Sequence, residues 1–123
     1  MLASSAVLLS GERRTAHFRA HERRPVQLRA SVWFPGSEER AHAQVLNLGL
    51  GGAGIACRAP LRQDDRVMLT LLAPSLLDPL VLPSAIAWVR APQQTAFLYA
   101  GVAFDAPDRT ALLPLFQLIG ALT

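Results

Sequence analysis

A chain of 123 residues has the length of one domain and is long enough to enclose a hydrophobic core. Its content of 51% hydrophobic and 17% charged residues excludes a disordered tail. All twelve basic residues are arginines, set against nine acids, and six of the arginines lie within residues 1–30 with two of the acids. The positive charge is therefore concentrated in an amino-terminal arm. The lone cysteine, Cys57, excludes an intrachain disulfide, and we expect it to be buried and inert in a cytoplasmic protein.

Residues 1–10 are small and apolar, but the basic cluster follows them instead of preceding them. The run is also too short to cross a bilayer, so we expect neither a secretory signal nor a membrane span. We interpret residues 1–16 as a flexible lead-in. The alternative is a short element that covers an edge of the fold.

Residues 11–24 form the basic arm. His17 and His21 are four positions apart, but they lack a third credible ligand, so we predict no metal site and no cofactor. Arginines can reach nucleic-acid phosphates, yet no recognition helix, zinc spacing or aromatic platform accompanies them. We therefore expect no specific nucleic-acid partner. A plain solvated basic segment is the simplest alternative for the arm.

From residue 25 the hydrophobic pattern alternates with period two, which is typical of strands with one buried face. Six strands are predicted, and the fourth is apolar enough for burial on both faces, whereas Pro83 should interrupt the fifth at an edge or bulge. The predicted ranges are 25–34, 38–46, 53–57, 67–73, 80–90 and 96–105. Short strands with turns every 8 to 15 residues predict an all-β fold, a closed or nearly closed six-stranded antiparallel barrel.

A carboxy-terminal α-helix is predicted from the Asp105–Asp108 start signal to about Leu122. Pro114 should kink this helix or delay its start. Apolar residues surround most of its circumference, so one face packs on the barrel and another is open to a protein partner or a homodimer. The alternative is a helix wholly covered by its own barrel.

The stretch 45–58, VLNLGLGGAGIACR, breaks an apolar strand with four glycines. Glycine weakens a strand, so its presence indicates a tight turn, a bulge or the close approach of another molecule. A simple glycine hairpin is sufficient to explain the spacing. Asn47 stands where the strand opens, however, and brings both a donor and an acceptor to the turn.

The pattern Arg-x-x-x-Arg at Arg19 and Arg23, followed by Asn-x-Gly-x-x-Gly from Asn47 to Gly52, resembles the PilZ domain, a bacterial receptor module for cyclic di-GMP. The family pattern is Arg-x-x-x-Arg and then Asp/Asn-x-Ser-x-x-Gly. Four of the five positions match, and Gly49 replaces the serine. The Ala-Trp-Val strand and the Gly-Val-Ala-Phe strand also look like PilZ strands, so the resemblance covers about residues 17–122.

The resemblance implies a cyclic di-GMP site made of Arg19, Arg23, Arg24, Asn47, Gly49 and Gly52. The arginines would clamp phosphate and stack on guanine, Asn47 would bond a guanine edge, and Gly52 would let the backbone approach the ligand. Glycine at position 49 implies weaker binding. Phe18 stands where family members that take two ligand molecules have an arginine, so one ligand is expected.

The implied signal is the ordering of the arm over the barrel when ligand binds, with motility, exopolysaccharide production or biofilm formation as the regulated process. The alternative is a degenerate PilZ domain that does not bind nucleotide and acts as a protein-interaction module. We do not expect an enzyme, because the chain has no nucleophile motif and no catalytic phosphate loop.

Overall fold

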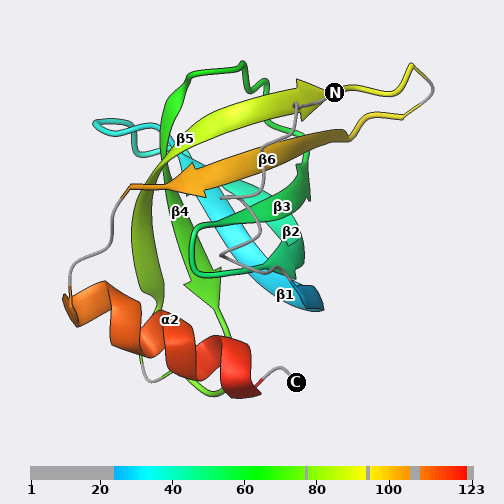
Figure 1. Ribbon diagram of the computed structural model, residues 1–123. Helices are drawn as coiled ribbons and strands as arrows, with labels where there is room; N and C mark the ends of the chain where they lie inside the picture. Colours follow the sequence, from blue (N-terminus) through cyan, green and yellow to red (C-terminus); the bar gives the residue numbers. More distant parts are fainter. Residues whose placement is uncertain (1–23, 77, 94, 106–108, 122–123) are drawn as a thin grey trace, which may run out of the picture.

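A computed structural model describes residues 24–76, 78–93, 95–105 and 109–121 of the chain. These residues form six strands followed by a helix (Figure 1). The elements are β1 (Arg24–Trp33), β2 (Ala41–Leu48), β3 (Gly52–Cys57), β4 (Arg66–Leu72), β5 (Leu80–Arg90), β6 (Leu98–Phe104) and α2 (Arg109–Ala121). Residues 1–23 lie outside the described part, and they include the predicted lead-in and all of the predicted arm except Arg24, the first residue of β1.

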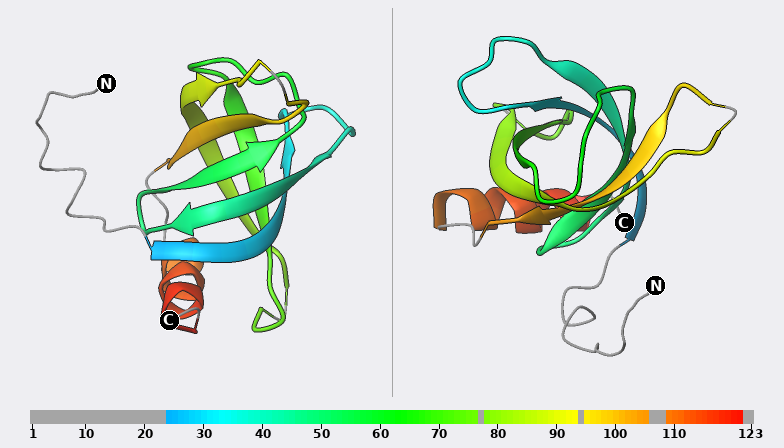
Figure 2. Two further views of the ribbon diagram at one scale, coloured as in Figure 1. Left: turned by 90° about the vertical axis from the view of Figure 1, so that its right-hand side faces the viewer. Right: turned by 90° about the horizontal axis from the view of Figure 1, so that it is seen from above.

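The strands close into a barrel in the order β1-β2-β3-β6-β5-β4, and every neighbouring pair is antiparallel. The view from above in Figure 2 shows the ring of strands. Closure leaves no exposed edge to pair with another chain. The predicted six-stranded barrel is thus confirmed, although most strand ends move by one to three residues.

The core follows from the alternation of inward and outward side chains. On β1, Leu28, Ala30 and Val32 point inward and are buried as predicted, whereas Phe34 lies beyond the strand and is 39% exposed. On β4 the prediction of burial on both faces is wrong at Leu72, which is 39% exposed. Thr70, also on the outer face of β4, is buried, and its hydroxyl accepts a hydrogen bond of 3.2 Å from Trp33 Nε1.

The helix α2 closes one end of the barrel and packs on β5 (Figures 1 and 2). Leu115 and Leu118 are its fully buried side chains. It runs without interruption through Pro114 and begins at Arg109, whereas the start signal was read from Asp105. Residues 106–108 of that signal lie outside the described part. No helix among the described residues is long and apolar enough to cross a membrane.

Pro83 does not interrupt β5, which contradicts the prediction from the sequence. Its carbonyl accepts a hydrogen bond of 2.9 Å from the backbone N–H of Asp105, just beyond the end of β6. The amide and carbonyl of one strand residue point to the same side, so the N–H that Pro83 lacks would face Asp105, one residue beyond the end of β6. Proline therefore removes no β5–β6 ladder bond here.

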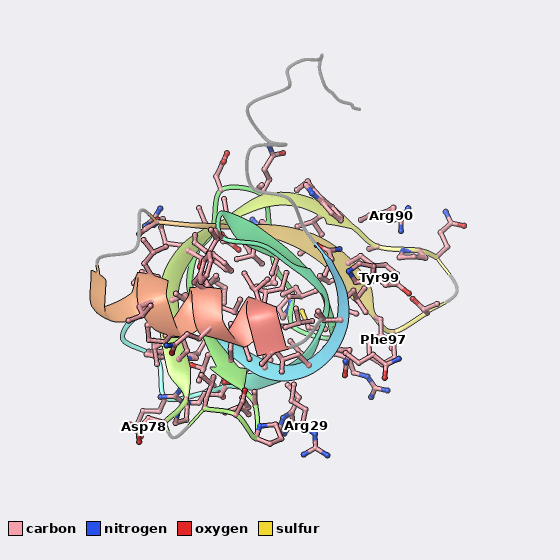
Figure 3. All side chains as sticks on the ribbon, turned by 60° about the horizontal axis from the view of Figure 1, so that its bottom comes forward. Arg29, Asp78, Arg90, Phe97 and Tyr99 are labelled. Atoms are coloured by element: carbon pink, nitrogen blue, oxygen red, sulfur yellow. The ribbon has the colours of Figure 1, made fainter. Side chains whose placement is uncertain are left out.

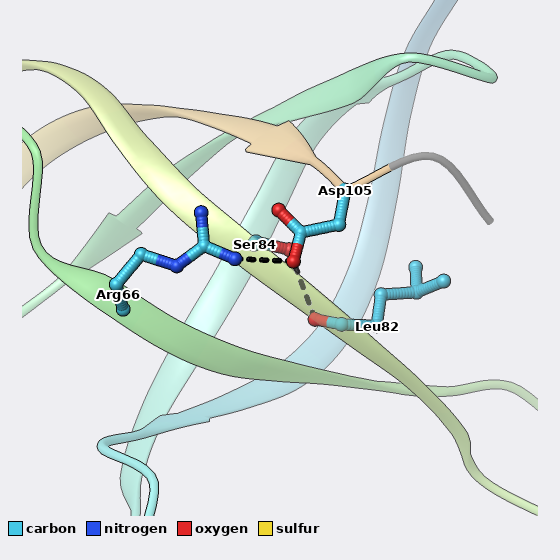
Figure 4. A network of polar contacts seen from close by, with 4 residues as sticks. All are labelled: Arg66, Leu82, Ser84 and Asp105. Atoms are coloured by element: carbon cyan, nitrogen blue, oxygen red, sulfur yellow. Dashed lines mark hydrogen bonds and ion pairs between the residues drawn. The ribbon is translucent and has the colours of Figure 1, made fainter.

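The same corner carries a small polar network (Figure 4). Arg66 at the start of β4 forms an ion pair with Asp105, and both side chains are largely exposed. The buried hydroxyl of Ser84 donates a hydrogen bond of 2.9 Å to the carbonyl of Leu82. Asp105 thus ties the end of β6 to β4, a role different from the helix-start role read from the sequence. An exposed pair of this kind contributes at most about 1 kcal/mol.

Cys57 is buried in the barrel core, as predicted. Burial raises the pKa of its thiol, an effect only partly offset by a backbone hydrogen bond at Ala59. Because the reactive species is the thiolate, we expect no reaction of native protein with an aromatic disulfide reagent at neutral pH. One thiol per chain should react after denaturation in urea. Rapid labelling of the native protein would contradict this burial.

Candidate functional site

A bulge in β2 sets the direction of the Asn47 side chain. The register of β2 on β3 shifts between Val45 and Asn47, which places Leu46 at the irregular position. The bulge allows both Val45 and Leu48, three residues apart, to point into the core, where both are fully buried. Asn47 therefore lies on the outer wall of the barrel, where strict alternation from Val45 would have turned it inward.

Asn47 is held against the neighbouring strand by Gly54. The backbone N–H of Gly54 donates a hydrogen bond of 2.9 Å to Asn47 Oδ1. A Cβ at position 54 would lie 2.6 Å from Asn47 Nδ2, so the amide occupies the space that a side chain would need. Gly54 is thus required for the close approach of the amide to the sheet, which fixes the direction of its polar groups.

The same arrangement recurs one strand further along, with an aromatic ring. Trp88 on β5 covers Gly101 on β6, and a Cβ at position 101 would lie 2.1 Å from Trp88 Nε1. Trp88 nevertheless keeps 45% of its surface exposed. A bulge between Ile86 and Trp88 turns the indole outward, just as the β2 bulge turns Asn47.

These four residues form one row across the outer wall, which we call the Asn47–Trp88 row. Asn47 pairs with Gly54, Gly54 pairs with Gly101, and Gly101 pairs with Trp88. Neighbouring strands are about 4.8 Å apart, so the amide and the indole lie over adjacent glycines. A polar amide beside an aromatic face is an arrangement suited to a planar ligand with hydrogen-bonding edges.

The start of β1 runs beside this row. Pro25 pairs with Asn47 and Arg24 pairs with Leu48, so the chain enters the barrel directly next to the β2–β3 turn. Arg19 and Arg23 lie outside the described residues, but Arg23 is joined directly to Arg24. The register therefore brings the attachment point of the arginine arm to the Asn47–Trp88 row, although the arm and Asn47 are more than 20 residues apart in sequence.

The two predicted glycines of the turn are both buried. The N–H of Gly49 donates a hydrogen bond of 2.9 Å to the carbonyl of Gly52, which closes the turn before β3. Among the described residues, positive φ angles belong to Gly36 and Asp64, so left-handed backbone does not explain Gly49 or Gly52.

Arginines and aromatic rings alternate on the wall beyond the row. Arg90 stacks on Tyr99 with 5.3 Å from Cζ to the ring centre, and Arg58 stacks on Phe97 at 4.8 Å. Figure 3 shows Arg90, Phe97 and Tyr99 on one side of the barrel. This edge is positively charged and aromatic, which favours anionic ligands that stack.

The described residues hold no group of three or more histidine, cysteine, aspartate or glutamate side chains that could bind a metal ion. A hollow of about 530 Å³ lies between β1 and the 73–79 loop, with Gln27 and Arg29 on its wall. Figure 3 shows Arg29 on a different side of the barrel from Arg90 and Tyr99. This hollow is separate from the Asn47–Trp88 row.

A family model described as the PilZ domain matches residues 17–121. The chain belongs to the PilZ domain family. Its matched range includes the arginine arm, the glycine turn and α2, and agrees with the resemblance seen in the sequence motifs. A search of curated proteins finds no match.

Solved structures share this PilZ fold at low sequence identity. The PilZ domain of YcgR from Escherichia coli, solved with c-di-GMP, has a TM-score of 0.65 at 12% identity, with 90% of this chain and 92% of that chain covered. The PilZ domain of CeSA from a cellulose-synthesizing bacterium gives 0.59 at 18% identity, with coverage of 81% and 96%. The Bacillus subtilis inhibitor of motility, MotI/DgrA, gives 0.64 at 12% identity and 90% coverage of this chain, which spans about half (51%) of that protein.

Reading the PilZ signature alone misses Gly54, Gly101 and Trp88 as parts of the site. In the sequence, Gly54 is the fourth glycine of the stretch 45–58, and Trp88 belongs to the Ala-Trp-Val strand that resembles a PilZ strand. The sequence does place one glycine in the middle of each of two apolar strands. A glycine there indicates that another group closely approaches the backbone. The pairing of those glycines with each other is a property of the barrel register.

We expect Gly101→Ala to push the Trp88 indole off the wall of the PilZ barrel, because the new methyl group occupies its place. Tryptophan emission should move to longer wavelength as Trp88 becomes more hydrated. Trp33, the other tryptophan, stays bonded to Thr70 and serves as an internal reference. The double variant Trp88→Phe/Gly101→Ala should lose the shift. An unchanged spectrum in Gly101→Ala would contradict the contact.

Proposed function

We propose that this PilZ domain is a receptor for cyclic di-GMP. The observation that carries the proposal is the β1–β2 register, which joins the Arg19–Arg23 arm to the barrel directly beside Asn47. Because Arg24, the residue after the arginine pair, is next to the end of β2, the register supports a common site for the arginine pair and the turn that follows Asn47. The YcgR domain with c-di-GMP bound has the same fold, which supports the choice of ligand.

The ligand is a dianion with two planar guanine bases, so its site needs cations and flat surfaces. Arg19, Arg23 and Arg24 supply guanidinium groups, which bond phosphate in a bidentate manner and also stack on bases. Asn47 provides an amide of fixed direction for a guanine edge. Trp88 adds an exposed ring face beside Asn47, and stacking of a base on an aromatic ring contributes about 1–3 kcal/mol.

In this proposal the arm carries the signal. Arg23 and Arg19 would fold back over the Asn47–Trp88 row when cyclic di-GMP binds, and the ordered arm would present a new surface. Phe18 in place of an arginine favours one ligand molecule. Backbone amide relaxation of residues 17–23 tests this step, and arm residues that are equally mobile with and without saturating nucleotide would refute it.

Titration calorimetry of the full chain with cyclic di-GMP at a fixed salt concentration tests the proposed function itself. Salt must be held constant because screening weakens contacts between arginine and phosphate. We expect micromolar or tighter binding with one nucleotide per chain. An absence of heat at high protein concentration would contradict the proposal.

Gly49→Ser should strengthen binding, because it restores the serine of the family pattern. One added hydrogen bond contributes about 0.5–1.5 kcal/mol, which is roughly a 2- to 13-fold gain in affinity. The same titration measures this effect, with Gly51→Ser as the control in the same turn. A weaker or unchanged affinity in Gly49→Ser would show that the side chain at this position does not face the ligand.

The second candidate function is a protein-interaction module that has lost the nucleotide. Gly49 and the exposed apolar side chains of α2, such as Leu113 and Phe116, favour it. In this case neither the wild type nor Gly49→Ser binds cyclic di-GMP, and a protein partner or a second copy docks through α2. Nucleotide binding that depends on Arg23 would refute this alternative.

A further inference from the structure

The outer side of α2 presents an apolar groove beside the glycine turn. Leu112, Leu113 and Phe116 are 40%, 59% and 62% exposed, although Leu115 and Leu118 on the same helix are fully buried. Together with Leu50 from the β2–β3 turn, the three exposed side chains line a hollow of about 350 Å³. All four lining side chains are hydrocarbon, so the groove suits an apolar occupant and offers no anchor for the nucleotide.

The groove is small for a stable interface between two proteins. A fully buried aromatic side chain removes only about 150–250 Å² from water. Four partly covered side chains therefore fall well short of the ~800 Å² per partner that a specific complex normally buries. A short segment tethered to the same domain needs far less area, because its effective concentration at the groove is in the millimolar range.

Residues 1–10, MLASSAVLLS, have the composition that such a groove accepts, with Val7, Leu8 and Leu9 in succession. They are joined to the barrel at Arg24, which pairs with Leu48, two residues before Leu50. Both α2 and the start of β1 lie at the same end of the barrel (Figures 1 and 2). The 14 residues from Ser10 to Arg24 span at most roughly 45–50 Å, with a typical end-to-end distance of about 20 Å.

We propose that, in the nucleotide-free protein, residues 1–10 of the same chain occupy the groove formed by Leu50, Leu112, Leu113 and Phe116. Val7, Leu8 and Leu9 cover the exposed leucines and the Phe116 ring, which removes apolar surface from water on both sides. The tether between this segment and β1 contains Arg19 and Arg23. Docking therefore restricts the reach of these arginines and connects the groove with the Asn47–Trp88 row.

A paramagnetic label tests the contact without any nucleotide, so its result is separate from that of the binding titration. Ser5→Cys in the full chain carries a nitroxide, while the buried Cys57 remains unlabelled. We expect the methyl signals of Leu50, Leu112 and Leu113 to lose most of their intensity in isotope-labelled protein diluted with unlabelled, diamagnetic chain. Leu72 and Val81, which are similarly exposed on the barrel wall, should stay sharp.

Phe116→Ser in the labelled protein should restore the leucine signals, and because Phe116 is largely exposed the barrel spectrum should persist. Sharp groove signals in the original labelled protein would overturn the proposal. So would broadening that needs the nitroxide on a different copy, because the occupant would then be a second chain. Broadening that survives in Phe116→Ser would also overturn it.

Discussion

Replacement of Arg23 by alanine should weaken cyclic di-GMP binding by roughly 10- to 150-fold, which corresponds to the loss of about 1.5–3 kcal/mol for hydrogen bonds to a charged group. Arg23 is one residue from the point where β1 pairs with the end of β2, next to Asn47. We propose that its guanidinium reaches the Asn47–Trp88 row from this attachment point. Titration calorimetry at one stated salt concentration measures the change.

Arg62→Ala is the matched control for Arg23→Ala. Arg62 is an exposed arginine in the loop before β4, and its removal changes the net charge by the same amount. A general electrostatic effect would weaken binding equally in both variants, and a specific clamp weakens it only in Arg23→Ala. Equal losses would contradict the assignment of the site to the arm.

Leu115→Ala should cause a large loss of stability. Its side chain is fully buried where the helix closes the barrel, and removal of a buried leucine costs about 2–5 kcal/mol. Urea denaturation followed by circular dichroism gives the free energy of unfolding. The midpoint should fall while the dependence on urea stays the same, because the folded state remains equally compact.

Leu113→Ala is the control two residues away on the same helix. Leu113 is 59% exposed, so its replacement should change the free energy of unfolding by no more than about 0.5 kcal/mol. Equal effects of the two substitutions would mean that α2 does not pack on the barrel through its Leu115 face. The comparison of the two variants also distinguishes the buried face of α2, which stabilises the fold, from the exposed face that lines the groove.

The barrel could be predicted from the sequence because the alternating pattern and the turn residues that mark each strand are local features of the chain. The alternation of Leu28, Ala30 and Val32 fixes one buried face, and turns at short intervals make antiparallel pairing the simplest topology. The prediction fails where a residue that is distant in sequence but close in space changes what a local pattern indicates. Pro83 stays within β5 because β6 has ended beside it, and Asp105 pairs with Arg66 ahead of the helix.

Only part of the candidate site could be predicted, because the rest depends on residues that are distant in sequence. Asn47 belongs to a motif that can be read from adjacent residues, whereas Trp88 reaches the site through three strand pairings. Both residues also depend on bulges that turn them outward, and a bulge shifts the alternation by one position without a clear signal in sequence. A complete prediction of the site needs the pairing register of the four strands β2, β3, β6 and β5.

If cyclic di-GMP binds over the Asn47–Trp88 row, it changes the surroundings of Trp88 and leaves those of Trp33 unchanged, so the two indole N–H signals report directly on the proposed site. Trp88 lies in the row, whereas Trp33 is bonded to Thr70 between β1 and β4. In a nitrogen–proton correlation spectrum, saturating nucleotide should move the Trp88 indole signal and leave the Trp33 signal in place. A Trp88 signal that stays fixed at saturation, or a shift confined to Trp33, would contradict binding over the Asn47–Trp88 row.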